Sequence, residues 1–392
     1  MSRLDRAERG PAYESQTNSE VAAVLFWLGV ALMCSAPVLL FLYMVYLHIY
    51  IRVRYLRFLV RVFQEKPLFI MPRGQPLPEA EEVRFPTSDG LMLSGCYVRA
   101  AGQRCGVILF GLEFGANRWS CRSYCDHLVK AGFDVFAFES RNQGDSDAMP
   151  GYEPLQWVTT YEVRDTEAAL AYLKDRPDAD PRGVGFFGIS KGGSAGLIVA
   201  AQDPYVRCCV TDGVFATYTT MVPFMKQWFR IYNNRYAIQG LIPLWFYGLI
   251  GLVGIRRTER ERHCRFPHLE RYLPCLAPRP LLMIHGLADN YIKPDMTTRL
   301  FTFACEPKEL WLVENAKHNH ALQVAGEEYR QRVLRFFETH LAKKTITTTN
   351  NTNHTNKEEA ARPRKQLHGK PTGRLLAPVF RLFFLFFGIL FV

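Results

Sequence analysis

The stretch Gly188-Ile189-Ser190-Lys191-Gly192 lies between the apolar run Val184–Gly188 and the helix-forming run Gly193–Ala201. A Gly-x-Ser-x-Gly pattern at a strand-to-helix turn predicts a strained serine with an exposed hydroxyl, because side chains at the glycine positions would collide with the neighbouring backbone. The five residues alone are weak evidence, since glycine-rich turns with a solvated serine are common. Their position between a strand and a helix indicates that Ser190 is a nucleophile.

Short apolar segments around this turn alternate with segments of helical period. This order predicts the α/β class, a mostly parallel twisted sheet with helices on both faces. The predicted strands are Val107–Phe110, Val135–Phe138, Val184–Gly188, Cys208–Val210, Leu281–Ile284 and Leu310–Val313. The predicted helices include Tyr161–Lys174 and Glu327–Leu341. Ahead of them, Val83–Phe85 and Leu91–Tyr97 predict an antiparallel hairpin with an Asp-Gly turn.

A serine nucleophile requires a base that takes its proton and an acid that orients the base. Asp289 follows the predicted strand Leu281–Ile284, and His318 lies between Leu310–Val313 and the last predicted helix. We therefore predict that Ser190 is the nucleophile, His318 the base and Asp289 the orienting acid.

Other residues compete for these roles. Asp212, after the strand Cys208–Val210, is an alternative acid, and His320 is an alternative base. Asp289 is also compatible with an ordinary turn or cap residue. We expect His285 to be structural.

The region from about Ala80 to Ala342 resembles the α/β-hydrolase superfamily, in particular its serine esterase, lipase, thioesterase and aminopeptidase-like branches. The chain order Ser, Asp, His is the order of that superfamily. Three further segments match its motifs: Phe138–Ser146, similar to a D-x-R-G-x-G-x-S segment, Asp89-Gly90 with Leu91 and Leu93, and the Ile-His-Gly run ending at Asp289. The resemblance implies an α/β-hydrolase fold with a cap insertion.

The loop Gly111–Asn117 departs from the family's usual His-Gly. By position, the resemblance assigns the backbone N–H of Phe114 and of Lys191 as the two oxyanion donors. Backbone donors tolerate replacement of side chains, but the carboxylate of Glu113 would repel a developing oxyanion. We expect Glu113 to face a structural partner such as an arginine, and the Lys191 side chain to be solvated or directed at substrate.

Residues 21–51 contain no Asp, Glu, Lys or Arg. The stretch exceeds the roughly 20 residues that cross a bilayer, so it predicts a transmembrane anchor after a polar N-terminus at 1–20. A cleaved signal peptide is the alternative, although its apolar region normally has about 7–15 residues. Residues 52–79 are expected to be a basic juxtamembrane linker. Its excess of Lys and Arg over the N-terminus predicts a single-pass membrane protein with a cytoplasmic catalytic domain.

The hydrolase domain is predicted at 80–342, with residues 217–279 as its cap. The cap is rich in large apolar residues and carries a basic cluster at 256–260, which suits a lipid-like substrate or a membrane surface. Ordinary packing onto the core is an equal alternative. Residues 343–374 are expected to be a disordered linker. The apolar tail 375–392 is expected to enter the membrane interface or to dock as a buried helix.

The formal net charge of +11 would suit nucleic acid, but no nucleic-acid-binding motif accompanies it, so the membrane is the expected partner. No metal constellation or dinucleotide fingerprint is found, and no cofactor is expected. The cysteine spacings show no disulfide framework, which indicates reduced thiols. The expected function is hydrolysis of carboxylic esters or thioesters through an acyl-enzyme. Lipid-like substrates are one option. A serine peptidase and an inactive membrane scaffold are the alternatives.

Overall fold

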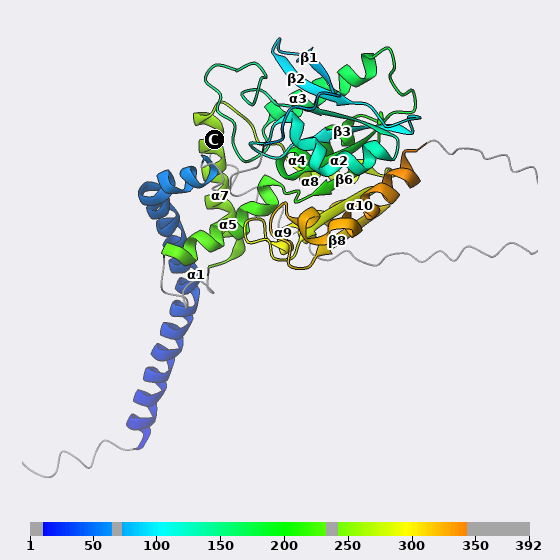
Figure 1. Cartoon of the computed structure of the whole chain (residues 1–392). Coiled ribbons are helices and arrows are strands. Elements are labelled where there is room, and N and C mark those ends of the chain that lie inside the picture. The colour runs from blue at the N-terminus through cyan, green and yellow to red at the C-terminus, as the bar shows by residue number, and fades with distance from the viewer. Residues whose placement is uncertain (1–10, 65–72, 233–241, 343–392) are drawn as a thin grey trace, which may run out of the picture. The chain divides into compact units, whose positions relative to one another are not determined.

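The structure, a computed structural model, describes residues 11–64, 73–232 and 242–342 of the 392-residue chain. Within these residues eight strands form one sheet in the order β1-β2-β4-β3-β5-β6-β7-β8 (Figure 1). The strands are β1 (Glu81–Pro86), β2 (Met92–Val98), β3 (Gly106–Gly111), β4 (Phe133–Phe138), β5 (Val184–Ile189), β6 (Val206–Asp212), β7 (Leu281–Gly286) and β8 (Lys308–Val313). All the predicted strands are confirmed, and the α/β class with them.

The first strands are antiparallel and the rest of the sheet is parallel. β2 pairs antiparallel with β1 and β4, whereas every pair from β4 to β8 is parallel. In the loop between β1 and β2, the Thr87 N–H donates to the Leu91 carbonyl, and Gly90 has φ +88°. The predicted hairpin and its glycine turn are therefore confirmed.

Burial along the strands explains their sequence patterns. β3, β4, β5 and β7 are buried at every position, because helices cover both faces of the sheet. β1, at one edge, alternates between exposed and buried residues. A strand that is buried on both sides is continuously apolar, which is why these segments were recognisable without alternation.

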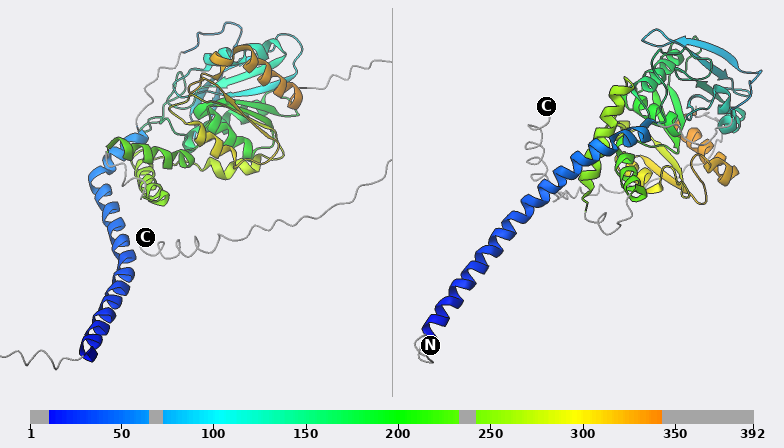
Figure 2. Two further views of the ribbon diagram at one scale, coloured as in Figure 1. Left: turned by 90° about the horizontal axis from the view of Figure 1, so that it is seen from below. Right: turned by 90° about the vertical axis from the view of Figure 1, so that its left-hand side faces the viewer.

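Helices cover both faces of the sheet (Figure 2). One buried cluster joins the sheet to α3 (Thr160–Asp175), α4 (Ser190–Gln202) and α9 (Pro294–Phe301), and also to α8 (Leu269–Tyr272) and a 3-10 turn at Leu273–Leu276. The other joins it to α2 (Cys121–Lys130), which follows a 3-10 turn at Arg118–Ser120, and to α10 (Ala321–His340). The predicted helices lie within α3 and α10, apart from Leu341, one residue past the end of α10.

The N-terminal helix α1 (Pro11–Gln64) is longer than the predicted anchor. Its segment Glu20–Arg61 is long and apolar enough to cross a membrane, a criterion that a signal sequence near an N-terminus also meets. The expectation of a linker from 52 is wrong for residues 52–64, which continue the helix. The reason is packing, since Leu59, Val60 and Phe63 are buried.

The described residues of the predicted cap region are mostly helical. It contains α5 (Thr217–Tyr232), α7 (Leu244–Glu261), α8 and the second 3-10 turn. Buried residues of α5 and α7 form a third apolar cluster with the C-terminal part of α1. We call these three elements, α5, α7 and the end of α1, the covering layer. Residues 1–10, 65–72, 233–241 and 343–392, including the predicted linker and tail, lie outside the described residues.

Candidate active site

The turn from β5 to α4 holds Ser190 in a strained conformation. Ser190 is the first residue of α4 and has φ +50°, a region that residues with a Cβ rarely adopt. The glycines beside it are required by close approach. A Cβ at Gly188 would lie 2.5 Å from the Cα of Gly193, and one at Gly192 would lie 2.3 Å from the Leu112 carbonyl oxygen. The pentapeptide therefore forms the sharp turn that its sequence predicts.

The structure brings Ser190, His318 and Asp289 into one hydrogen-bonded chain. Ser190 Oγ lies 3.0 Å from His318 Nε2, and His318 Nδ1 lies 2.6 Å from Asp289 Oδ2. The other Asp289 oxygen accepts hydrogen bonds from the backbone N–H groups of Tyr291 and Ile292. Ser190 is 5% exposed and His318 9%. This geometry allows the imidazole to take the serine proton while the carboxylate holds the ring in place.

The alternative acid and base lie elsewhere. Asp212 Oδ2 accepts a hydrogen bond from the Tyr329 hydroxyl at 3.0 Å, and burial together with the nearby Glu113 and Asp289 raises the pKa of Asp212 to about 7. His320 is exposed at the start of α10. His285 is buried, with its Nε2 2.8 Å from the Ile292 carbonyl oxygen. These positions fit structural roles for Asp212 and His285.

The loop Gly111–Asn117 lies directly against the Ser190 turn. Its first residues line a small cavity of about 20 Å³ together with Phe114, Lys191 and Gly192. The Lys191 N–H belongs to the first turn of α4, where backbone N–H groups have no acceptor within the helix and the helix dipole favours negative charge. Phe114 and Lys191 are thus neighbours at this cavity, and their assignment as oxyanion donors remains a prediction.

Glu113 is buried and its partner is an amide. Asn319, the residue after His318, donates its side-chain N–H to Glu113 Oε2. The expected arginine partner was therefore wrong. Burial raises the pKa of Glu113 to about 7, although the hydrogen bond from Asn319 acts in the opposite direction. Below that pH the carboxyl is mostly neutral, which removes the repulsion of an oxyanion that the sequence suggested.

The Lys191 side chain is buried, so the expectation of a solvated or substrate-directed cation was wrong. Its Nζ donates to Glu162 Oε1 at 2.8 Å and to the Leu155 carbonyl at 2.6 Å. Glu162, from α3, also accepts from the Tyr152 hydroxyl. Burial acts to raise the pKa of Glu162, but the charge and hydrogen bonds of Lys191 hold it below its usual value. The pair ties the first turn of α4 to the first turn of α3.

The segment Phe138–Ser146 forms buried ion pairs that join neighbouring elements near the site. Arg141 is fully buried and forms ion pairs with Asp165 of α3 and with Asp89 of the β1–β2 loop, each at 2.7 Å. The hydrogen bond from Arg141 lowers the pKa of Asp89 to about 2. Two of the segments on which the sequence resemblance rests are thus in contact, and they brace the sheet without touching the serine.

Aromatic side chains pack over the His318 ring. The sequence analysis did not predict this packing. The rings of Tyr291 and Phe215 lie 5.1 and 6.4 Å from the His318 ring, centroid to centroid. Phe215 in turn contacts Trp157 at 5.6 Å, and Trp157 contacts Phe63 of α1 at 5.6 Å. Three rings in contact, those of Phe63, Trp157 and Phe215, therefore connect α1 to His318. Phe63, Trp157 and Phe215 are far apart in the chain, so no local sequence pattern predicts this aromatic packing.

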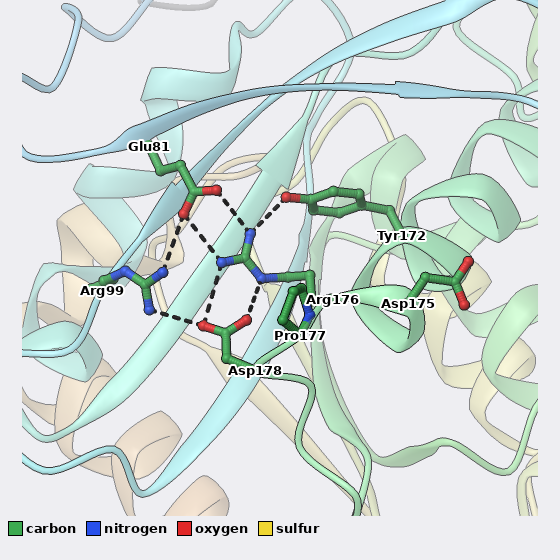
Figure 3. A pocket seen from close by; sticks show the side chains of 7 residues that line it. All are labelled: Glu81, Arg99, Tyr172, Asp175, Arg176, Pro177 and Asp178. Carbon is green, nitrogen blue, oxygen red and sulfur yellow. Dashed lines mark hydrogen bonds and ion pairs between the residues drawn. The ribbon is translucent and has the colours of Figure 1, made fainter.

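A pocket of about 450 Å³ lies away from this site (Figure 3). Arg176 lies at its centre and pairs with Glu81 and Asp178, which also pair with Arg99. These four charged side chains thus pair with one another. The network fastens the β1–β2 edge to the end of α3. Within residues 11–64, 73–232 and 242–342, no group of three or more His, Cys, Asp or Glu side chains is arranged to hold a metal ion.

Comparisons with known proteins agree with this architecture. Residues 109–244 match the family model described as alpha/beta hydrolase fold. The uncharacterized protein YfhR of Escherichia coli O157:H7 is 27% identical over 264 residues, 66% of this chain and 80% of YfhR. The polyketide transferase ATR5 of Stachybotrys chlorohalonatus is 24% identical over 66% of this chain and 96% of its own.

Among solved structures, the esterase Pf2001 of Pyrococcus furiosus superimposes with a TM-score of 0.52. Its sequence is 20% identical, and the match covers 71% of this chain and 98% of the esterase. At this identity the likeness shows the fold. The matched portion of the chain carries the Ser190 turn.

Proposed function

Because the chain belongs to the α/β-hydrolase superfamily, we propose that it is a serine hydrolase that cleaves carboxylic esters or thioesters through an acyl-enzyme. One observation carries the proposal: a strained, buried serine within 3.0 Å of a histidine that is itself bonded to a buried aspartate. Hydrogen-bonded nucleophile, base and acid at a strand-to-helix turn are the arrangement that activates a neutral hydroxyl.

The reaction divides into two steps. Ser190 Oγ attacks the substrate carbonyl while His318 Nε2 takes the hydroxyl proton, and the collapsing intermediate expels the alcohol or thiol, which receives that proton from His318. Water then attacks the acyl-enzyme with His318 as base, and releases the carboxylic acid and free Ser190. Asp289 orients His318 and stabilises its charged form, and the N–H groups of Phe114 and Lys191 bind the oxyanion.

The alternatives have less support. A peptidase that recognises a substrate amino terminus needs an unpaired acidic group, but Glu113 and Glu162 beside the small cavity are bonded to Asn319 and Lys191. An inactive scaffold would have no need of the strained serine or of its bond to His318.

We also propose that α1 anchors the enzyme in a membrane with the hydrolase domain in the cytoplasm. The charge-free stretch 21–51 supports the anchor, and the arginines at 52, 54, 57 and 61 that follow it support the orientation. An acyl substrate of lipid-like character is consistent with this location and with the apolar covering layer.

The proposal is tested by labelling with a fluorophosphonate probe, which reacts only with an activated serine. The full-length wild type is expected to be labelled, and Ser190→Ala to lose all labelling. Ser123→Ala, a change of an exposed serine on α2, is the matched control and should be labelled like the wild type. Equal labelling of Ser190→Ala and the wild type would refute the assignment.

A further inference from the structure

Helix α7 packs against the last part of α1 (Figure 1). Near its start, the Phe246 ring lies 6.2 Å from the His48 ring. Further along, a Cβ on Gly254 would lie 3.1 Å from the Phe63 ring, and at the end Gln64 donates to Glu261 at 2.9 Å. The start of α7 therefore lies beside residue 48 of α1, and its end lies beside residue 64.

The length of the charge-free stretch in α1 fixes the depth of this contact. Glu20 is charged, so the hydrocarbon core begins no earlier than Val21. At about 1.5 Å per residue, about 20 residues cross a core of about 30 Å, which therefore ends at about residue 41 or later. Residue 48 then lies within about 10 Å of the hydrocarbon, in the headgroup region or deeper. The first turns of α7 share that depth.

The exposed side chains of α7 suit this position. Leu244 is 59% exposed, Trp245 45% and Leu249 41%, and no charged residue occurs before Arg256. Arginines follow at 256, 257 and 260, farther from the hydrocarbon, as Arg52, Arg54 and Arg57 follow the apolar part of α1. Both helices thus change from apolar to basic in the same direction, the order that a bilayer with anionic headgroups favours.

We propose that the first two turns of α7 are a second membrane contact, inserted in the interface of the bilayer that α1 crosses, and that acyl substrates reach Ser190 from this bilayer through the covering layer. The occupant of the exposed apolar face of α7 is the phospholipid bilayer. This inference rests on the proposed anchoring by α1. It adds a substrate class, esters whose acyl chains lie in the membrane.

The position of the covering layer links this contact to the chemistry. α7 packs on α5 and on Phe63 of α1, and the ring series from Phe63 through Trp157 and Phe215 ends on His318. Ser190 is only 5% exposed, so a substrate reaches its hydroxyl only when some of the residues that cover it move aside. The covering layer contacts lipid on one side and lies over His318 on the other. When this layer opens, it therefore opens towards the acyl chains in the membrane.

The contact itself is tested by quenching of tryptophan fluorescence by brominated phosphatidylcholine. Full-length protein is reconstituted in phosphatidylcholine and phosphatidylserine vesicles with and without the brominated lipid. Trp245→Phe is expected to lower the quenched fraction, because it removes a tryptophan near the acyl chains. Trp311→Phe, a change on β8 far from α1 in sequence, is expected to raise that fraction, because it removes a protected one. Equal or higher quenching in Trp245→Phe would overturn the proposal.

The functional consequence is tested with two substrates. Leu244→Ser/Leu249→Ser is expected to lower kcat/KM for a long-chain ester dispersed in the vesicles by about tenfold, and to leave a short soluble ester within about twofold. Phe303→Ser, at an exposed apolar residue after α9, should change neither value. An equal loss on both substrates would contradict entry from the bilayer.

The outcomes separate this inference from the proposals on which it rests. If the wild type hydrolyses neither ester and resists the fluorophosphonate, the hydrolase assignment fails while the quenching result still decides the contact. If the wild type leaves the vesicles in a high-salt wash, the anchor fails. If the enzyme is anchored and active but Trp245 is not quenched, the inference alone fails.

Discussion

The sheet with its catalytic loops and the covering layer above it are held together in different ways. Around the sheet, buried ion pairs join distant elements, as in Lys191 with Glu162 and Arg141 with Asp165. The covering layer is held by aromatic and aliphatic contacts, and its ion pairs, such as Arg257 with Glu261, lie in solvent. Buried pairs demand a unique geometry, whereas apolar contacts tolerate sliding. The comparison predicts that the sheet holds Ser190, His318 and Asp289 in place and that the covering layer opens more easily than the sheet.

The largest effect is expected from the acid on the sheet side. Asp289→Asn should lower kcat/KM by about 10⁴-fold, because the amide no longer holds His318 in the required tautomer. Asp212→Asn is the matched control, since this carboxyl accepts a hydrogen bond from the Tyr329 hydroxyl and not from His318. Steady-state kinetics on a soluble ester measures both. A larger loss in Asp212→Asn than in Asp289→Asn would show that Asp212 is the acid and that the assignment of Asp289 is wrong.

An intermediate effect is expected in the covering layer. Phe63→Ala removes a fully buried ring that contacts Trp157 and should lower the free energy of opening this layer by about 3 kcal/mol. Hydrogen exchange in α5 and α7 should then become about 100-fold faster, while α4 stays protected. Phe58→Ala, at an exposed ring on the same helix, should leave exchange unchanged. Equal acceleration in α4 would show that the layer and the sheet open as one unit.

The smallest effect concerns the pH dependence of stability. The pKa of Glu113 is about 7 in the folded chain, against an ordinary value of 4.5. Between these two pH values the carboxyl is therefore protonated in the folded state and ionised in the unfolded state. Stability is therefore lost as pH rises from about 5 to about 7, by up to about 3 kcal/mol. Glu113→Gln should remove this loss and become more stable than the wild type at pH 8 relative to pH 5. Thermal unfolding across this range measures it, and parallel curves for the two proteins would contradict the buried titration.

Local patterns in the sequence determined the parts of this protein whose structure depends on neighbours in the chain. The buried strands follow from continuous apolar runs, and the Ser190 turn follows from glycines where a Cβ cannot fit. The order of Ser190, Asp289 and His318 along the chain selected the three residues that the structure brings together. The same reasoning ended α1 too early, because the arginines from residue 52 looked like a linker while the intervening residues pack on α7.

Only the tertiary structure decided the partners of buried charges and the position of the covering layer. Glu113 contacts Asn319, 206 residues away in the chain, and Lys191 contacts Glu162, 29 residues away. No local sequence pattern therefore predicts the burial or the partners of Glu113 and Lys191. The physical reason is that the cost of burying a charge depends on which distant group meets it. The sequence placed Ser190 at its strand-to-helix turn, and the packing of distant segments decided what surrounds it.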